Sequence, residues 1–124
     1  MYLCHVTQLP ENGARGFDTE SAGQATIFVL RRGDQVRAWR DSCPHHGTPL
    51  PWRRDAYFDG AGQHLVCAAH GALFDPLTGL CTLGPCLGDT LTAVPLRIDD
   101  DGGLHVDAGD PLYLFQEKHP GDSP

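Results

Sequence analysis

Two short cysteine–histidine clusters constrain this chain more than any other feature of its sequence. Residues 43–47 read Cys-Pro-His-His-Gly, and residues 67–71 read Cys-Ala-Ala-His-Gly. Each cluster places one thiol and one imidazole within a single turn and closes with a glycine. Glycine accepts a positive φ angle, so the backbone there can pass close to a bound group. Two matched halves of this kind predict one metal centre with two sulfur and two nitrogen ligands.

The predicted ligands are Cys43, His45, Cys67 and His70. A [2Fe-2S] cluster can be held by two cysteines on one iron and two histidines on the other. A structural zinc ion can also bind two cysteines and two histidines, but such sites more often pair cysteine with cysteine and histidine with histidine. The mixed pairing in both halves therefore favours an iron–sulfur cluster over zinc.

The two clusters and their flanks resemble the cluster-binding loops of Rieske iron–sulfur proteins. The resemblance is carried by residues 43–50 and 67–75, then by Thr78-Gly79, and Gly84-Pro85 resembles the family's proline-bearing third loop. It covers roughly residues 1–115.

The Rieske resemblance implies a cofactor and a role for each ligand. The cofactor is a Rieske-type [2Fe-2S] cluster, with Cys43 and Cys67 on one iron and His45 and His70 on the other. In this family the histidine-bound iron is the one nearer to solvent. These four residues are thus both the cofactor-binding and the metal-binding residues, and no catalytic residue is expected.

This chain departs from the family pattern in ways that bear on the redox potential. The spacing between the two pairs is longer than is common, and we assign the extra residues to a surface loop over 52–62. High-potential members join their loops by a disulfide where this chain has Thr48 and Ala69. They also place hydroxyl groups near the sulfurs where it has Ala72 and Phe74. Hydrogen bonds to cluster sulfurs raise the potential, so we predict a low one, roughly −150 mV.

Three cysteines, Cys4, Cys81 and Cys86, lie outside the ligand set. Their number is odd and the N-terminus shows no export signal, so we predict three thiols and no disulfide. A free cysteine commonly behaves as a small buried hydrophobe. Cys86 follows Gly84-Pro85 and is expected near the cluster as a packing residue. His46 is interpreted as an exposed histidine, with partner contact or cluster tuning as the alternative.

Composition and charge narrow the class of protein. The 124 residues suffice for one domain, and the formal net charge is −7. An acidic chain without a basic, aromatic-lined face does not suit nucleic-acid binding. It suits steering toward a basic patch on a protein partner, and Trp39 and Trp52 are candidates for a docking face. No signal peptide and no apolar run of about 20 residues is present, which favours the cytoplasm and no membrane contact.

Short apolar segments separated by glycine and proline predict an all-β fold. We expect a Rieske-like antiparallel β-sandwich with a small cluster-binding subdomain. The domain is assigned to residues 1–116, its cluster-binding subdomain to about 42–86, and a flexible tail to 117–124. Residues 11–23 are predicted to form a loop. Strands are predicted over residues 1–9, 24–31, 35–40, 64–66, 80–83, 90–98, 104–106 and 111–116.

The resemblance implies a Rieske-type ferredoxin, a carrier of single electrons. Such a protein takes electrons from a flavin-dependent reductase and passes them to a terminal oxygenase. An oxygenase subunit would need a second domain with a mononuclear iron bound by two histidines and a carboxylate, which this chain does not offer, so we predict no enzymatic activity of its own. Two alternatives stay open: the small Rieske-fold subunit of an assimilatory nitrite reductase, and a zinc-binding interaction module.

Overall fold

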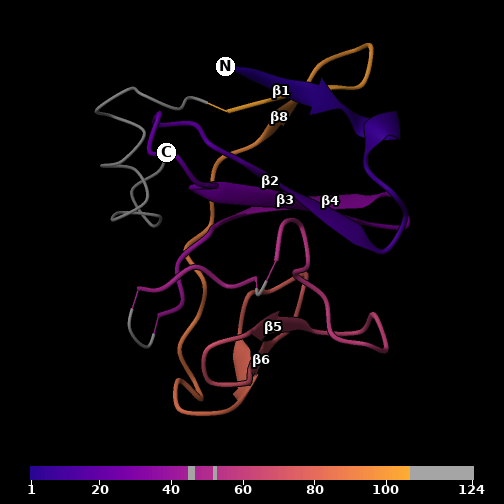
Figure 1. Cartoon of the computed structure of the whole chain (residues 1–124). Coiled ribbons are helices and arrows are strands. Elements are labelled where there is room, and N and C mark those ends of the chain that lie inside the picture. Colours follow the sequence, from indigo (N-terminus) through magenta and orange to yellow (C-terminus); the bar gives the residue numbers. More distant parts are fainter. Residues whose placement is uncertain (45–46, 52, 107–124) are drawn as a thin grey trace.

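The computed structural model describes residues 1–44, 47–51 and 53–106, and this part of the chain is almost entirely β-structure (Figure 1). The predicted all-β class is confirmed. The predicted strand at 111–116 and the tail at 117–124 lie outside the described residues. The strands are β1 (Tyr2–His5), β2 (Gly13–Phe17), β3 (Ile27–Arg32), β4 (Gln35–Arg40), β5 (Leu65–Cys67), β6 (Ala72–Phe74), β7 (Cys81–Leu83), β8 (Arg97–Ile98) and β9 (Gly103–His105), with a 3-10 turn, η1 (Val6–Gln8), after β1.

The described strands pair into three antiparallel sheets, with the orders β1-β9-β8, β2-β3-β4 and β5-β6-β7. In Figure 1 the sheet β2-β3-β4 lies between β1 and β8 on one side and β5 and β6 on the other. None of the helical structure in the described residues is long and apolar enough to cross a membrane.

The buried side chains form two separate cores. The base core lies between the first two sheets, and the cluster-end core lies between β2-β3-β4 and β5-β6-β7. The base core comprises Cys4, Leu9, Ile27, Val29, Ala38, Val94, Leu104 and Val106. The cluster-end core comprises Phe28, Leu30, Trp39, Cys43, Leu50, Tyr57, Leu65, Cys67, Ala72, Phe74, Cys81, Cys86 and Leu91.

Strand β3 contributes side chains to both cores. Its first four residues are all fully buried, because successive side chains of a strand point to opposite faces and both faces of β3 are covered. Ile27 and Val29 enter the base core, whereas Phe28 and Leu30 enter the cluster-end core. A continuous apolar run of this kind is the mark of a central strand, and the predicted β3–β4 hairpin is confirmed.

The prediction of a loop over residues 11–23 is wrong in part. Strand β2 forms there and pairs with β3 from Phe17↔Ile27 to Gly13↔Arg31. Its sequence, Gly-Ala-Arg-Gly-Phe, lacks the alternation of apolar and polar residues that identifies a strand. Pairing with β3 determines the extended conformation of β2. Within β2, the Arg15 guanidinium lies over the Phe17 ring, 4.9 Å from the ring centroid.

The predicted strands at 1–9 and 90–98 are shorter in the structure. The first ends at His5, whose ring accepts the backbone N–H of Thr7 and so begins the 3-10 turn. The second is reduced to isolated bridges at Thr90 and Ala93, followed by the short β8. Pro95 lies within this stretch and has no N–H to donate to a ladder, which explains the interruption.

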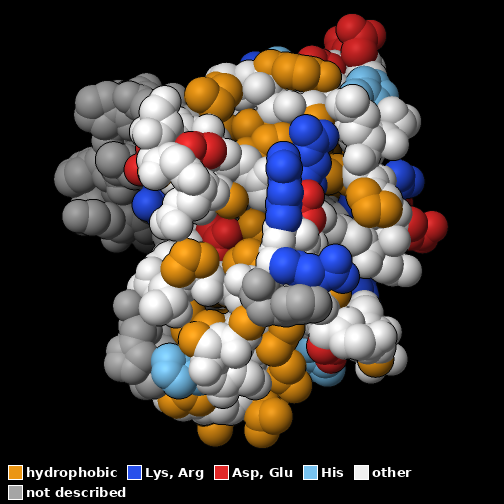
Figure 2. All heavy atoms as spheres, viewed as in Figure 1, with side chains coloured by type: hydrophobic (Ala, Val, Ile, Leu, Met, Phe, Trp, Pro, Cys, Tyr) orange, Lys and Arg blue, Asp and Glu red, His pale blue; other side chains and the backbone are white. Residues whose placement is uncertain are grey.

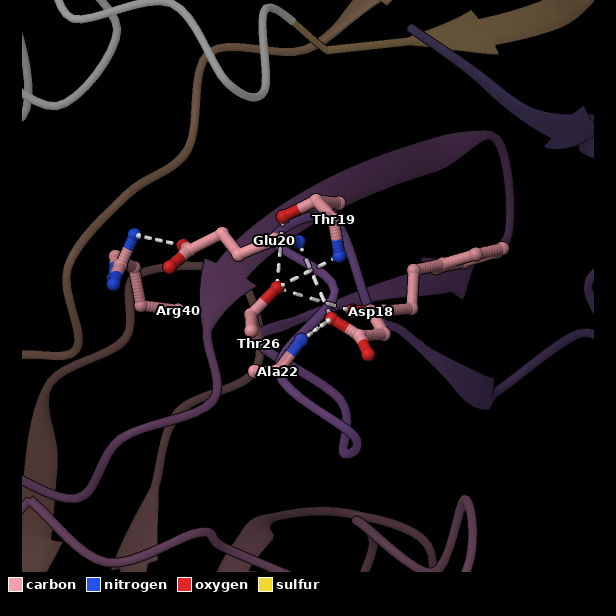
Figure 3. Close-up of polar contacts among 7 residues, drawn as sticks. Asp18, Thr19, Glu20, Ala22, Thr26 and Arg40 are labelled. Carbon is pink, nitrogen blue, oxygen red and sulfur yellow. Dashed lines mark hydrogen bonds and ion pairs between the residues drawn. The ribbon is translucent and has the colours of Figure 1, made fainter.

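The connection between β2 and β3 is organised around the Asp18 carboxylate (Figure 3). This carboxylate accepts backbone N–H groups from Glu20, Ala22 and Gly23 at 2.8–3.2 Å. The loop ends in a hydroxyl pair, because the Thr19 and Thr26 Oγ1 atoms lie 2.7 Å apart. The backbone N–H groups, that of Ala22 first, lower the pKa of Asp18, and with the hydroxyl pair they keep the connection compact.

Side chains of β3 and β4 tie the middle sheet to the loops at the cluster end. The Trp39 indole N–H donates to the Pro76 carbonyl at 3.1 Å, and the Arg37 guanidinium donates to the Leu77 carbonyl at 3.2 Å. Arg32 donates to the Gly62 carbonyl at 3.1 Å. The two arginines thus bind the loops through hydrogen bonds to backbone carbonyl groups. Trp39 is buried, so the expectation that it belongs to a docking face is wrong. Trp52 lies outside the described residues.

The turn between β8 and β9 depends on the ionised carboxylate of Asp99. Its Oδ2 lies 2.8 Å from His105 Nε2, and its Oδ1 accepts the N–H groups of Gly103 and Asp101 at 2.8 and 2.9 Å. The His105 contact, followed by the Gly103 amide, lowers the pKa of Asp99 to about 2. A lowered pKa stabilises the fold above the ordinary value near 3.9, and this contribution disappears as the pH falls toward about 2.

We therefore expect wild-type protein to be more stable than Asp99→Asn at neutral pH, with the difference shrinking as the pH falls from about 4 to about 2. Asparagine keeps an acceptor for the turn amides and removes only the charge. Urea unfolding followed by circular dichroism at a series of pH values measures the gap. A gap that stays constant over this range would show that the charge of Asp99 contributes nothing.

Candidate metal centre

The first cysteine–histidine loop follows β4 directly and turns back at a glycine. The Cys43 N–H donates to the Thr48 carbonyl at 2.8 Å, and the Gly47 N–H donates to the Cys43 carbonyl at 2.7 Å. Gly47 has a φ of 74°, as predicted for the residue that closes the loop. The Cys43 side chain is 1% exposed and faces the cluster-end core. His45 and His46 lie outside the described residues.

The second loop connects β5 to β6 and repeats this geometry. Cys67 is the last residue of β5, and the Gly71 N–H donates to its carbonyl at 2.8 Å. Gly71 has a φ of 72°, within two degrees of Gly47. Cys67 is fully buried, whereas His70 is exposed at the tip of the loop. A thiol that faces inward and an imidazole that faces outward are what a centre at the rim of a core requires.

The two loops lie side by side. The Ala68 N–H, directly after Cys67, donates to the Leu50 carbonyl of the first loop at 2.8 Å. Cys43 and Cys67 belong to the same core, so the structure brings both predicted sulfur ligands together. Within the described ranges no three metal-ligating side chains converge into a complete site.

A third segment, residues 83–87, packs against Ala72, where the second loop enters β6. Gly84 has a φ of 109°, and a Cβ atom at this position would lie 2.8 Å from the Cα atom of Ala72. Cys86, two residues later, is buried beside Cys43 and Cys81. Burial and the neighbouring Cys81 sulfur raise the pKa of Cys86 to about 12, so it is a thiol at neutral pH. The expectation that Cys86 packs near the cysteine ligands is consistent with this position.

Close packing at Gly84 yields a test with a matched control. Gly84→Ala should destabilise the protein by about 2 kcal/mol or more, because it combines an unfavourable φ with a backbone collision at Ala72. Gly88→Ala has a similar φ of 92° but no atom within 4 Å of the added methyl group, so only the φ penalty applies. Thermal unfolding of both variants should show the larger loss for Gly84→Ala. Equal losses would mean that contact with Ala72 is unimportant.

A buried carboxylate supports the first loop, and sequence analysis missed it. Asp41 Oδ1 accepts the Leu50 N–H at 2.8 Å, and Oδ2 accepts the Tyr57 hydroxyl at 2.8 Å. Tyr57 is fully buried and stacks on Phe28, with ring centroids 4.2 Å apart. Burial raises the pKa of Asp41, and burial next to Asp41 raises that of Tyr57. The extra residues assigned to a surface loop thus include a core residue; the apolar run around Tyr57 was the available signal.

The remaining residues singled out in the sequence fall into the expected surroundings. Cys4 is buried in the base core, away from the two loops, and burial raises the pKa of its thiol. Ala72 and Phe74 are fully buried on β6 and bring no hydroxyl group to the second loop. The Thr48 Oγ1 atom is buried without a hydrogen-bond partner among the described residues, so a polar group bound between the loops could satisfy it.

The sequence profile of the Rieske [2Fe-2S] domain matches residues 1–96, which include both loops and the strands β1 to β7. The chain belongs to the Rieske [2Fe-2S] domain family. The cofactor of this Rieske domain is accordingly a Rieske-type [2Fe-2S] cluster, and the zinc alternative is set aside. Buried thiols, glycine turns of matching φ and the unpartnered Thr48 hydroxyl fit such a group between the loops.

Solved structures of similar fold include ferredoxins of about the same length as this chain. The ferredoxin of carbazole 1,9a-dioxygenase from Nocardioides aromaticivorans IC177 is 27% identical, with a TM-score of 0.62 over 84% of this chain and 93% of that one. A chain in the complex of reduced oxygenase and oxidized ferredoxin in carbazole 1,9a-dioxygenase is 26% identical, with a TM-score of 0.66 over 89% and 93%. The Sphingomonas yanoikuyae B1 ferredoxin is 25% identical, with a TM-score of 0.65 over 86% and 96%. A comparison with curated proteins gives no match.

Proposed function

We propose that Cys43, His45, Cys67 and His70 hold the cluster, the two cysteines on the inner iron and the two histidines on the outer one. The burial of both cysteines in one core and the exposure of His70 at the loop tip support this division. The hydrogen bond between Ala68 and Leu50 keeps the two loops in register, so that ligands from separate segments can meet. Asp41 accepts the Leu50 N–H and the Tyr57 hydroxyl, and so connects the residues on either side of the first loop.

We propose further that this Rieske domain is a ferredoxin, an electron carrier between a flavin-dependent reductase and a terminal oxygenase. When bound, the cluster supplies a one-electron couple. The likeness in sequence and nearly full length to ferredoxins that serve a dioxygenase supports this role. The single observation that carries the proposal is the combination of two buried cysteines with an exposed histidine, His70, on neighbouring loops, because an exposed ligand brings the edge of the cofactor close to solvent.

The exposed end of the domain suits transient docking. Leu83 and Leu87, on the third segment, are 58% and 68% exposed, and Gly84 between them packs against the second loop. Figure 2 shows hydrophobic side chains at the end of the molecule that holds β5 and β6, and arginine side chains across its middle. Apolar contact around a redox centre, with charge farther out, permits specific but short-lived complexes.

The proposal assigns this protein no reaction of its own and places it in the cytoplasm. In the carbazole 1,9a-dioxygenase complex a ferredoxin is paired with a separate oxygenase, and we assign the oxygenase reaction to such a partner. Buried thiols such as Cys4 are retained most readily in a reducing compartment. Neither nucleic acid nor membrane is part of the proposed function.

Anaerobic titration with dithionite tests the carrier function. Protein with its iron intact should accept one electron per cluster and then show the paramagnetic signal of a reduced Rieske centre. Mixed with a terminal oxygenase and its aromatic substrate, the reduced protein should be reoxidised and give hydroxylated product. Failure to accept an electron would end the proposal. Stable association with a large haem-bearing partner, without oxygenase turnover, would favour the nitrite reductase alternative.

The potential is expected at the low end of the Rieske range, roughly −150 mV. Neither Ala72 nor Phe74 offers a hydroxyl hydrogen bond to a cluster sulfur, and such bonds stabilise the reduced state. Protein-film voltammetry measures the value, and Ala72→Ser, which restores one hydroxyl group on β6, should raise it. A wild-type potential well above 0 mV, or an unchanged potential in Ala72→Ser, would show that other groups set it.

A further inference from the structure

Two thiols that the proposed function does not use lie in contact beneath the third segment. Cys81, at the start of β7, and Cys86, at the turn that follows, have their Sγ atoms 2.8 Å apart. Both are buried, at 1% and 2% exposed. The intervening residues 82–85 are all exposed, as is Leu87. A single layer of turn residues therefore separates this pair from solvent.

The backbone around the pair is held by hydrogen bonds that do not involve either sulfur. The Cys81 N–H donates to the Asp89 carbonyl at 2.7 Å, and the Cys81 carbonyl accepts the Gly88 N–H at 3.1 Å. The Cys86 carbonyl accepts the Asp89 N–H at 2.8 Å. Both cysteines are thus bonded to Asp89, and Cys81 is also bonded to Gly88, so the backbone of this small loop is fixed on both sides of the sulfur pair.

We propose that Cys81 and Cys86 form a reversible disulfide, a redox modification site distinct from the cluster. A disulfide needs an S–S distance of about 2.05 Å, so the sulfurs must approach by only about 0.8 Å from their present separation. Cys86 lies in the turn after β7, outside any strand, so the approach does not require two paired strands to move. The site goes beyond the electron-carrier function and does not depend on which partners the protein serves.

The oxidant is a peroxide, and the disulfide forms in two steps. One thiol gives up its sulfur-bound proton and takes one oxygen atom from hydrogen peroxide, which yields a sulfenic acid and water. The sulfur of the second thiol then displaces hydroxide from the sulfenic acid, which forms the S–S bond and a second water. In total two thiols and one peroxide give one disulfide and two waters. A dithiol such as dithiothreitol reverses the modification by exchange.

Cys86 also hydrogen-bonds to Cys43. The experiment must therefore distinguish a Cys86–Cys43 disulfide from the proposed Cys81–Cys86 disulfide. In cluster-loaded protein Cys43 is a predicted iron ligand and is not available for a disulfide. The experiment therefore uses the full chain with its cluster bound, under conditions in which visible absorption shows that the cluster survives. Only then does a disulfide of Cys86 identify its natural partner.

The sequence allows a direct assignment by mass spectrometry. Cleavage before aspartate releases residues 75–88, a peptide that contains Cys81 and Cys86 and no other cysteine. After mild hydrogen peroxide treatment, denaturation and alkylation, this peptide should lack both alkyl groups and two hydrogens, and dithiothreitol should restore both alkylation sites. Cys4→Ala should behave identically, because it removes a buried thiol of the base core. Cys81→Ala should leave Cys86 without a disulfide.

The wild-type measurement decides the proposal even if a variant fails to fold. Two alkyl groups on the 75–88 peptide after peroxide treatment, with the cluster still bound, would overturn it. A link between Cys86 and Cys43, or oxidation to sulfinic acid that dithiothreitol does not reverse, would overturn it as well. None of these outcomes bears on electron transfer, so the carrier function stands or falls separately.

Discussion

Cys67→Ala is expected to abolish cluster binding, whereas Cys4→Ala is expected to leave it intact. Both substitutions remove one sulfur from a fully buried side chain, and the two cysteines belong to different cores. The packing loss is therefore similar, about 1–2 kcal/mol, and cancels in the comparison. What differs is the position of Cys67 at the end of β5, where the second loop begins.

The measurement is iron and acid-labile sulfide per chain, together with the visible spectrum, for both variants purified under identical conditions. Without the Cys67 thiolate one iron loses half of its protein ligands, and metal binding contributes directly to folding free energy. Cys67→Ala should therefore also unfold at a markedly lower temperature than Cys4→Ala. If Cys67→Ala retained a full complement of iron with an unchanged spectrum, the assignment of the second loop would be wrong.

Asp41→Ala is expected to destabilise the protein by about 2–4 kcal/mol, with a much smaller effect for Asp41→Asn. Alanine leaves two buried donors, the Leu50 N–H and the Tyr57 hydroxyl, without their acceptor. Each unsatisfied buried group costs about 1–3 kcal/mol. Asparagine can still accept the Leu50 N–H through its oxygen and donate from its amide to the Tyr57 oxygen, so both contacts persist.

Urea unfolding monitored by circular dichroism should show the difference. A loss of about 3 kcal/mol corresponds to a midpoint lower by about 1–2 M urea for a domain of this size. Because Asp41 also positions Leu50, whose carbonyl accepts the Ala68 N–H, Asp41→Ala should lose its cluster sooner on dilution into chelator. Equal stability of the alanine and asparagine variants would mean that the Asp41 carboxylate does not support the loop through these two bonds.

The features that the sequence predicted well are those with a local signature. The glycine turns after Cys43 and Cys67 have the expected positive φ at Gly47 and Gly71, because a glycine at a fixed short spacing from a predicted ligand is visible in the sequence itself. The buried run of β3 and its hairpin with β4 are similarly visible, since hydrophobic burial is encoded residue by residue along a strand.

The features that the sequence did not reveal depend on contacts between distant segments. Asp41 and Tyr57 are sixteen positions apart and meet only because β4 and the following segment enclose one core. Strand β2 has no pattern of its own and exists through its pairing with β3. The contact between Cys81 and Cys86 follows from the fold of one turn, whereas spacing alone left three thiols without any indication of which two lie together.

The two buried faces of β3 have a consequence for how this protein unfolds. A strand that forms one wall of each core cannot shift or detach without exposing apolar surface in both, so the base and the metal-binding end should open in a single step. Amide hydrogens of Phe28 and Val29 should then exchange at nearly equal, very slow rates. Heating should therefore expose the base core and the cluster-end core together, in one transition at one temperature.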